Sequence, residues 1–89
     1  MKAIFTAIGV DQVGVVHSVS GLFKKYNLNI INLNQNLMEG YFTMIVVLGI
    51  DNMNVEFSEL VEAVEELAKE LKLDLKIQHE NIFNSMHSI

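Results

Sequence analysis

The chain has 89 residues, of which 51% are hydrophobic, and a formal net charge of −5 at pH 7. It has no cysteine, so neither disulfides nor a zinc site built on thiolates can reinforce a core of this small size. Every basic residue is a lysine, and this acidic, arginine-free composition excludes nucleic acid as the expected partner. We therefore expect oligomerisation to supply the missing stability, in a homodimer or a higher homo-oligomer.

The hydrophobic residues are spread along the chain. No apolar run approaches the roughly 20 residues that a membrane span needs. The first residues lead directly into a strand pattern and lack the apolar core of a signal peptide. We expect a cytoplasmic protein that does not bind a membrane, with residues 1–89 forming a single domain.

Two periodicities follow each other at the start of the chain. Residues 2–8 alternate as a strand does, and residues 9–12 form the expected turn. From Val13 the spacing becomes helical, and the helix is predicted to end at Asn27, which tolerates the left-handed geometry of a helix cap. The apolar positions of this helix form two adjacent rows: Val16, Val19 and Phe23, and Val15, Val19, Leu22 and Tyr26.

The middle of the chain reads as a hairpin. Residues 28–38 alternate again, but the apolar phase slips between Ile30 and Ile31, which predicts a β-bulge. Glu39 and Gly40 form the predicted tight turn, with glycine at a positive φ. Residues 41–50 return as a strand that is apolar on both faces. Its second face should therefore be covered, either by the end of the chain or by another subunit.

The last part of the chain contains the clearest helix. After the polar connection 51–54, the helix is predicted from a single apolar stripe: Phe57, Leu60, Val61, Val64, Leu67, Ala68 and Leu71. Residues 73–80 alternate cleanly as an edge strand. Residues 82–89 have the spacing of a short C-terminal helix.

The element order is β-α-β-β-α-β. It predicts an α+β, ferredoxin-like sandwich: a four-stranded antiparallel sheet with the first and third strands central and two helices on one face. Missing residue types exclude several proteins of this shape. Without cysteine there is no metallochaperone pair or iron–sulfur cluster, and without arginine there is no acylphosphatase phosphate site. The strand aromatics lack the basic neighbours of an RNA-binding domain.

The first loop carries a family resemblance. It reads Gly9-Val10-Asp11-Gln12-Val13-Gly14-Val15-Val16 and is followed by Asn29-Ile30. This resembles the ACT-domain pattern, in which an Asp/Asn-x-x-Gly turn enters the first helix and Asn-Ile opens the second strand. The element order matches from residue 2 to residue 80. The ending Glu80-Asn81-Ile82-Phe83 is similar to that of small standalone ACT proteins of bacteria and archaea. Many ACT loops read Asp-Arg-Pro-Gly, whereas this one has Gln12 and Val13.

The resemblance implies a non-catalytic regulatory domain that binds a small ligand, an amino acid, at a subunit interface. The implied lining is Asp11, Gln12, Val13, Gly14 and Val15 of one subunit, with Asn29 and Ile30 opposite. Physical chemistry supports this loop as a carboxylate site, because a helix start presents unpaired N–H groups and a partial positive charge. Gly14 has no Cβ to hinder the approach, and Asp11 could pair with an α-ammonium group.

Each of these residues also has a purely structural interpretation. Asp11 could cap the first helix, Gly14 could permit close helix–sheet packing, and Asn29 could be a capping or exposed residue. The alternative function is a protein–protein interaction module without a small ligand. The strand 28–38 is a candidate dimer edge, with its asparagines at 32, 34 and 36 on the polar face.

Other chemistry has little support in the sequence. No catalytic constellation stands out, so we do not expect an enzyme. The histidines His17, His79 and His87 lack the spacing of a metal site, and we expect neither a metal nor a cofactor.

Overall fold

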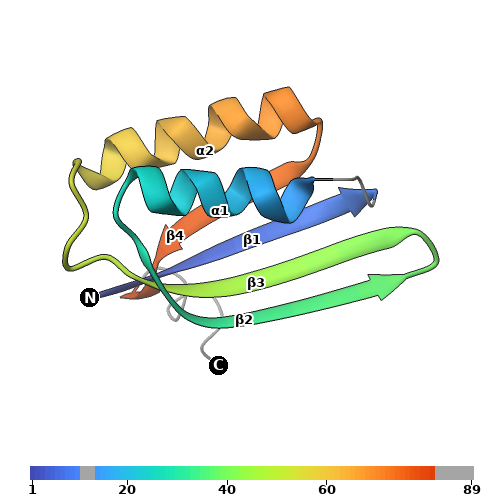
Figure 1. Ribbon diagram of the computed structural model, residues 1–89, viewed down its shortest axis with the longest axis horizontal. Coiled ribbons are helices and arrows are strands. Elements are labelled where there is room, and N and C mark those ends of the chain that lie inside the picture. The colour runs from blue at the N-terminus through green and yellow to red at the C-terminus, as the bar shows by residue number, and fades with distance from the viewer. Residues whose placement is uncertain (11–13, 82–89) are drawn as a thin grey trace.

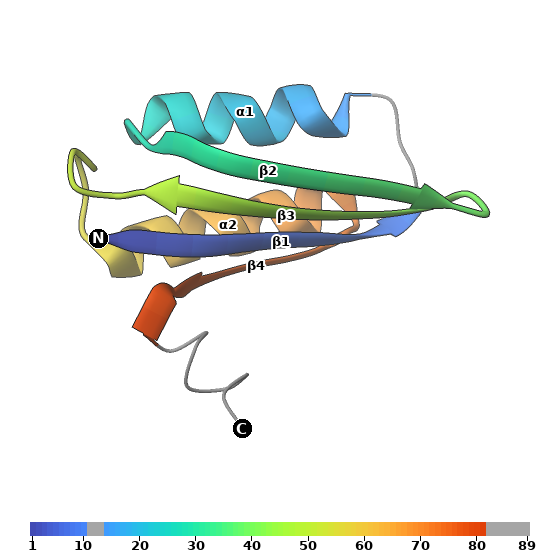
Figure 2. The same cartoon turned by 90° about the horizontal axis from the view of Figure 1, so that it is seen from below.

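The computed structural model describes residues 1–10 and 14–81. Their elements are β1 (Lys2–Val10), α1 (Val15–Lys25), β2 (Asn29–Met38), β3 (Tyr41–Gly49), α2 (Phe57–Leu71) and β4 (Asp74–His79). The strands form one antiparallel sheet in the order β2-β3-β1-β4, and the helices lie together on one side of it (Figures 1 and 2). The predicted ferredoxin-like βαββαβ architecture is confirmed. The predicted C-terminal helix over 82–89 lies outside the described residues.

The core lies between the helices and one face of the sheet. Because strand side chains alternate, Ala3, Phe5 and Ala7 of β1 share this face, and all three are fully buried. The Phe5 ring meets Phe23 of α1 edge-on, with centroids 5.1 Å apart. The remaining buried side chains come from α1, β3, α2, β4 and the residues next to β3 and β4, while β2 contributes none: Val15, Val19, Phe42, Met44, Val46, Leu48, Ile50, Leu60, Val64, Leu73, Leu75 and Ile77.

The start of the chain differs from the prediction in two places. Gly9 and Val10 belong to β1, not to a turn, because they pair with Phe42 and Tyr41 of the long hairpin. Glycine is suited to position 9, since a Cβ there would collide with Leu73 Cδ2. The apolar row of α1 that enters the core begins at Val15, while Val16 is 43% exposed. Asn27 ends this helix region at φ 58°, as predicted.

The hairpin follows the sequence closely. Ile30 pairs with Leu48 and Asn32 pairs with Val47, so Ile31 is the extra residue of the predicted bulge. In the two-residue turn both Glu39 (φ 51°) and Gly40 (φ 82°) have positive φ angles. This is the signature of a type I′ turn, whose twist suits a hairpin. The prediction assigned a positive φ to the glycine alone.

The loop before α2 is tied to the end of α1. The Asn27 side-chain amide donates to the Asn52 carbonyl over 2.7 Å, and the Asn54 amide donates to the Lys25 carbonyl over 3.1 Å. The N-cap residue of α2 is Glu56, which makes no side-chain capping bond. Asn52 and Asn54 thus join the loop before α2 to the end of α1, and they do not cap α2.

Candidate functional site

The first half of the predicted site is the start of α1. Gly14 is the N-cap residue, in a left-handed conformation (φ 87°), and its carbonyl accepts the first helical hydrogen bond from the Ser18 N–H over 2.9 Å. Apart from its chain neighbours and the helix backbone, no atom of residues 1–10 and 14–81 lies within 4 Å of where a Gly14 Cβ would be. The first turn contains no acidic residue. Its first N–H groups have no acceptor within the helix, so they and the helix dipole can receive an anion.

The other residues of this loop are placed less completely. Val15 is buried in the core, so it could offer a ligand only its backbone N–H. Asp11, Gln12 and Val13 lie outside the described residues. Their capping or ligand-binding roles therefore stay predictions.

The second half of the predicted site is the start of β2. Asn29 pairs with Gly49, and its Cβ lies 3.6 Å from where a Gly49 Cβ would stand, on the face of the sheet away from the helices. Ile30 pairs with the buried Leu48, so its side chain, 44% exposed, turns toward the helix side. The structure therefore places these two side chains on opposite faces of the same edge strand.

The two halves are far apart within one chain. The strand register aligns Val10 with Tyr41 and Tyr41 with Met38 at one end of the sheet, where α1 begins. It aligns Lys2 with Gly49 and Gly49 with Asn29 at the other end, where α1 finishes (Figure 2). The 11 residues of α1 alone span about 16 Å at 1.5 Å per residue. A single copy therefore does not bring Gly14 and Asn29 together.

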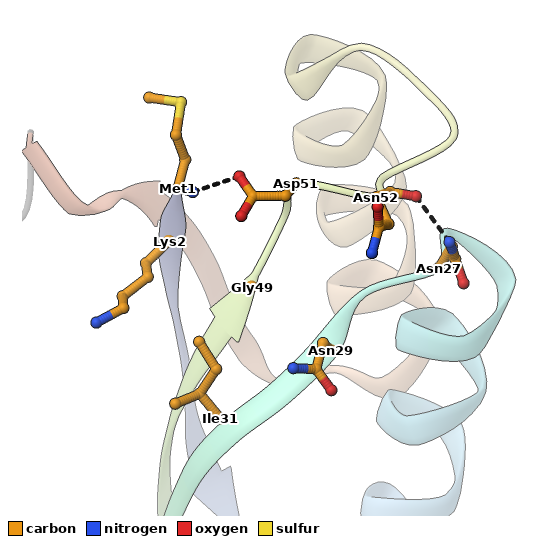
Figure 3. A pocket seen from close by; sticks show the side chains of 8 residues that line it. All are labelled: Met1, Lys2, Asn27, Asn29, Ile31, Gly49, Asp51 and Asn52. Atoms are coloured by element: carbon orange, nitrogen blue, oxygen red, sulfur yellow. Dashed lines mark hydrogen bonds and ion pairs between the residues drawn. The ribbon is translucent and has the colours of Figure 1, made fainter.

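A pocket that the sequence did not predict lies at the Asn29 end (Figure 3). Its volume is about 190 Å³, and its polar lining includes Asn29, Asp51 and Asn52. The Asp51 carboxylate pairs with the Met1 ammonium group across its rim. Asn27 beside it is held by the Asn52 carbonyl. The polar residues of positions 27–29 and 51–52 were visible in the sequence, but only the strand order shows that they meet.

The outer edge of β2 is open. All ten of its residues are exposed. Met38 and Tyr41 flank a two-residue turn, so they form a hydrogen-bonded pair, and the inward-bonding positions alternate from there. The backbone groups of Leu33, Gln35 and Leu37 consequently point outward, away from β3. Such an edge is a template for pairing with another strand.

The described residues hold neither a metal cluster nor a membrane span. Within residues 1–10 and 14–81, no three metal-binding side chains lie close enough together to hold an ion. His17 and His79 are on different elements, α1 and β4, and His87 lies outside these residues. None of the described helices has the length and apolar character needed to cross a bilayer.

The fold defines the class first: a ferredoxin-like βαββαβ domain with a glycine-capped first helix and an open β2 edge. Residues 2–78 match the ACT domain family. A UPF0237 protein of Clostridium perfringens is 46% identical over 89 residues, with 100% of both chains covered. The solved ACT domain protein from Streptococcus pneumoniae is 36% identical, with a TM-score of 0.81 over 93% of both chains. The chain therefore belongs to the ACT domain family.

A more distant structure shares the fold alone. The regulatory subunit of aspartate kinase from Thermus thermophilus is 19% identical, with a TM-score of 0.66 over 88% of this chain and 50% of that one. The relatives in Clostridium and Streptococcus match over nearly their whole length. This confirms the resemblance to small standalone ACT proteins.

Proposed function

We propose that this protein is a non-catalytic regulatory ACT domain that binds a small amino acid between two copies of the chain. The observation that carries the proposal is the separation of the two half-sites, combined with the open β2 edge between them. A site made of both halves requires a second copy. The ACT family resemblance supplies the expectation that these halves belong to one site.

Pairing of two β2 edges brings the halves together. If the strands pair antiparallel about the middle of Asn29–Met38, the start of one β2 lies beside the end of the other. The end of β2 is the end of the sheet at which α1 begins. Asn29 and Ile30 of one copy then lie next to the helix start at Gly14 of the other, with Ile30 on the helix side. The outward backbone groups of Leu33, Gln35 and Leu37 supply the hydrogen bonds.

The chemistry of the helix start favours a carboxylate. The first-turn N–H groups and the partial positive charge of the helix attract an anion, and the first turn has no acidic residue to compete with it. An adjacent apolar side chain at Ile30 suits an aliphatic amino acid. Asp11 remains the proposed partner of the α-ammonium group.

The regulatory role would arise by linkage. A ligand held across the interface stabilises the paired copies. A partner protein that binds only the paired copies then responds to the ligand concentration. The distant fold relative is itself a regulatory subunit, that of aspartate kinase, which is consistent with such a role. The alternative is an interaction module without a small ligand, which the exposed apolar residues of the sheet favour.

A thermal-shift screen against the twenty amino acids, at fixed protein concentration, tests the proposal. A ligand at one hundred times its dissociation constant adds about 2.7 kcal/mol, and each kcal/mol raises the melting temperature of a domain this size by about 4–8 °C. We expect a selective shift with one amino acid or a few similar ones. We also expect Gly14→Val, which places a β-branched side chain at the helix start, to abolish it.

The control is Gly21→Ala, which changes an exposed glycine within α1, remote from the helix start. It should keep the ligand-dependent shift. No shift with any amino acid would contradict the proposal and favour the interaction module.

A further inference from the structure

The sheet face away from the helices carries an ordered apolar stripe. Along the two central strands the register sets side chains of β1 directly beside side chains of β3. The exposed fractions are 62% for Tyr41, 60% for Val10, 50% for Ile8 and 43% for Ile45. From one end of the sheet to the other, the neighbouring pairs are Val10–Tyr41, Ile8–Thr43, Thr6–Ile45 and Ile4–Val47.

Mainly polar side chains border this stripe on both sides. Along β2 the same face carries Asn32, Asn34 and Asn36, which pair with open-face positions of β3, and it ends with the exposed Met38 beside Tyr41. Along β4 it carries Asp74, Lys76 and Gln78, which pair with those of β1. An apolar centre inside a polar rim is the anatomy of a protein–protein interface. Contiguous apolar patches on soluble proteins usually mark such sites.

We propose that a second copy of this chain covers this face, related by a two-fold axis that crosses β1 and β3 between the Ile8–Thr43 and Thr6–Ile45 pairs. This interface is distinct from the β2 edge and does not depend on the ligand. Because a two-fold interface uses the same patch twice, the patch must be complementary to itself.

The apolar stripe meets that requirement. The axis places Ile8 of one copy over Thr6 of the other, and Ile45 over Thr43. Large side chains thus face small ones at the centre, which lets two layers interdigitate. Farther out, Tyr41 lies over Val47 and Val10 lies over Ile4, so apolar groups face apolar groups. No two of the largest side chains compete for one position.

The charged rim is complementary under the same axis. Asp74 and Lys76 are neighbours on the open face of β4, one in each of the two central rows. The axis brings the β4 strands of the two copies together and sets the Asp74 carboxylate toward the Lys76 ammonium group of the second copy. A two-fold axis parallel to the strands would instead place β4 over the uncharged asparagines of β2.

The area of the face reaches the lower end of the range for stable pairs. With β1 of nine residues in a sheet of four strands, the face measures about 30 Å by 19 Å, from a rise of ~3.4 Å per residue and a strand spacing of ~4.8 Å. The flat footprint of about 600 Å² is a lower bound for a corrugated surface, and stable interfaces bury roughly 600–1,000 Å² per partner. Two sheets packed in this way lie about 10 Å apart.

Molar mass tests the pairing. By sedimentation equilibrium at micromolar concentration, Ile45→Glu, which puts a carboxylate at the centre of the stripe, should have half the wild-type mass. Ser58→Glu adds the same charge to an exposed position of α2 and should keep the wild-type mass. A folded Ile45→Glu variant with the wild-type mass would overturn the proposal and point to residues 82–89 or a different protein as the cover. A monomeric wild-type protein would also overturn it.

Charge variants test the axis. Asp74→Lys should weaken the pairing about tenfold, since it replaces two exposed ion pairs of modest strength with pairs of like charges. Adding Lys76→Asp to Asp74→Lys should restore the wild-type dissociation constant, because the opposed charges are then exchanged. Equal dissociation constants for the wild type, the Asp74→Lys variant and the double variant would overturn this axis.

A separate variant distinguishes the β2-edge pairing, on which the proposed function rests, from the pairing of the open sheet faces. Gln35→Pro removes an outward N–H of β2 and leaves the open face unchanged. If Gln35→Pro keeps the wild-type mass while Ile45→Glu halves it, the edge pairing fails and the face pairing stands. If Gln35→Pro halves the mass while Ile45→Glu keeps it, the face pairing fails and the edge pairing stands.

Discussion

Gly14 and Asn29 stand at opposite ends of the sheet, although only α1 and a short turn separate them in the sequence. The helix runs antiparallel to β1 and lies beside β2, so its first residue is at the hairpin end and β2 starts at the other end (Figure 2). The two residues that the family pattern links to one ligand therefore need two chains to meet. Substitutions can test the geometry at the start of α1, the geometry at the start of β2, and the β2 edge at which two copies would pair.

The positive φ of Gly14 predicts a cost for any side chain there. Gly14→Ala should lower the free energy of unfolding by about 1–2 kcal/mol, because a Cβ is disfavoured in the left-handed region. No non-neighbouring atom of the part of the chain that the structure describes lies within 4 Å of the added atom, so this cost is that of the backbone conformation. Gly21→Ala, also in open space but within α1, should instead raise the stability by about 0.5–1 kcal/mol. Chemical denaturation would measure both, and a stabilising Gly14→Ala would contradict the assigned conformation.

The hairpin turn contains a correctable strain. Glu39 has a positive φ of 51° in a type I′ turn, a position at which asparagine is strongly preferred. Glu39→Asn should therefore raise the melting temperature, by a few degrees for a gain of about 0.5–1 kcal/mol. Differential scanning calorimetry would detect the change. Glu39→Val, whose β-branched side chain resists this geometry, should have the opposite effect, and equal temperatures for both variants would rule out the turn type.

Asn27 joins the end of α1 to the loop before α2. Its amide donates to the Asn52 carbonyl while its backbone has a φ of 58°. Asn27→Gly keeps the backbone geometry and removes the hydrogen bond, so it should cost no more than about 0.5–1.5 kcal/mol. Asn27→Ala loses the bond and also strains the backbone, and should cost more. The difference between their denaturation free energies separates the two effects, and a smaller cost for alanine than for glycine would contradict the account.

The outward backbone of β2 predicts the effect of proline at its edge. Gln35→Pro removes an N–H that points away from β3, so the chain should still fold, as proline is tolerated on edge strands. It should nevertheless lose the β2–β2 pairing and the ligand-dependent thermal shift. Gln35→Ala keeps the N–H and should retain both. Circular dichroism and molar mass would be measured together, and a proline variant that keeps both the shift and the wild-type mass would contradict the edge interface.

The fold was predictable because the periodicities are strong. The bulge at Ile30–Ile31, the end of the first helix at Asn27 and the two-faced apolar strand 41–50 were each visible as a change in residue pattern. The end of β1 was not predictable from its own residues. Gly9 is normally a turn residue, and only pairing with Phe42 and contact with Leu73 explain it as part of a strand.

The sequence identified candidate site residues but not their positions relative to one another. The pattern nominated Gly14 and Asn29, but their separation follows from the path of α1 over the sheet. The pocket that joins Asn29 to Asp51 and Asn52 depends on strand order, which brings distant turns to one end. Local sequence patterns contain no information about such long-range contacts.

Subunit complementation tests whether the ligand site is shared between two copies of the chain. Gly14→Val damages the helix half of the site, and Asn29→Ala/Ile30→Ala damages the strand half, so neither variant alone should bind the amino acid that shifts the wild type. In an equal mixture refolded together, each mixed pair carries one intact site, and titration calorimetry should recover about a quarter of the wild-type sites. A mixture that binds no more than the separate variants would contradict a shared site.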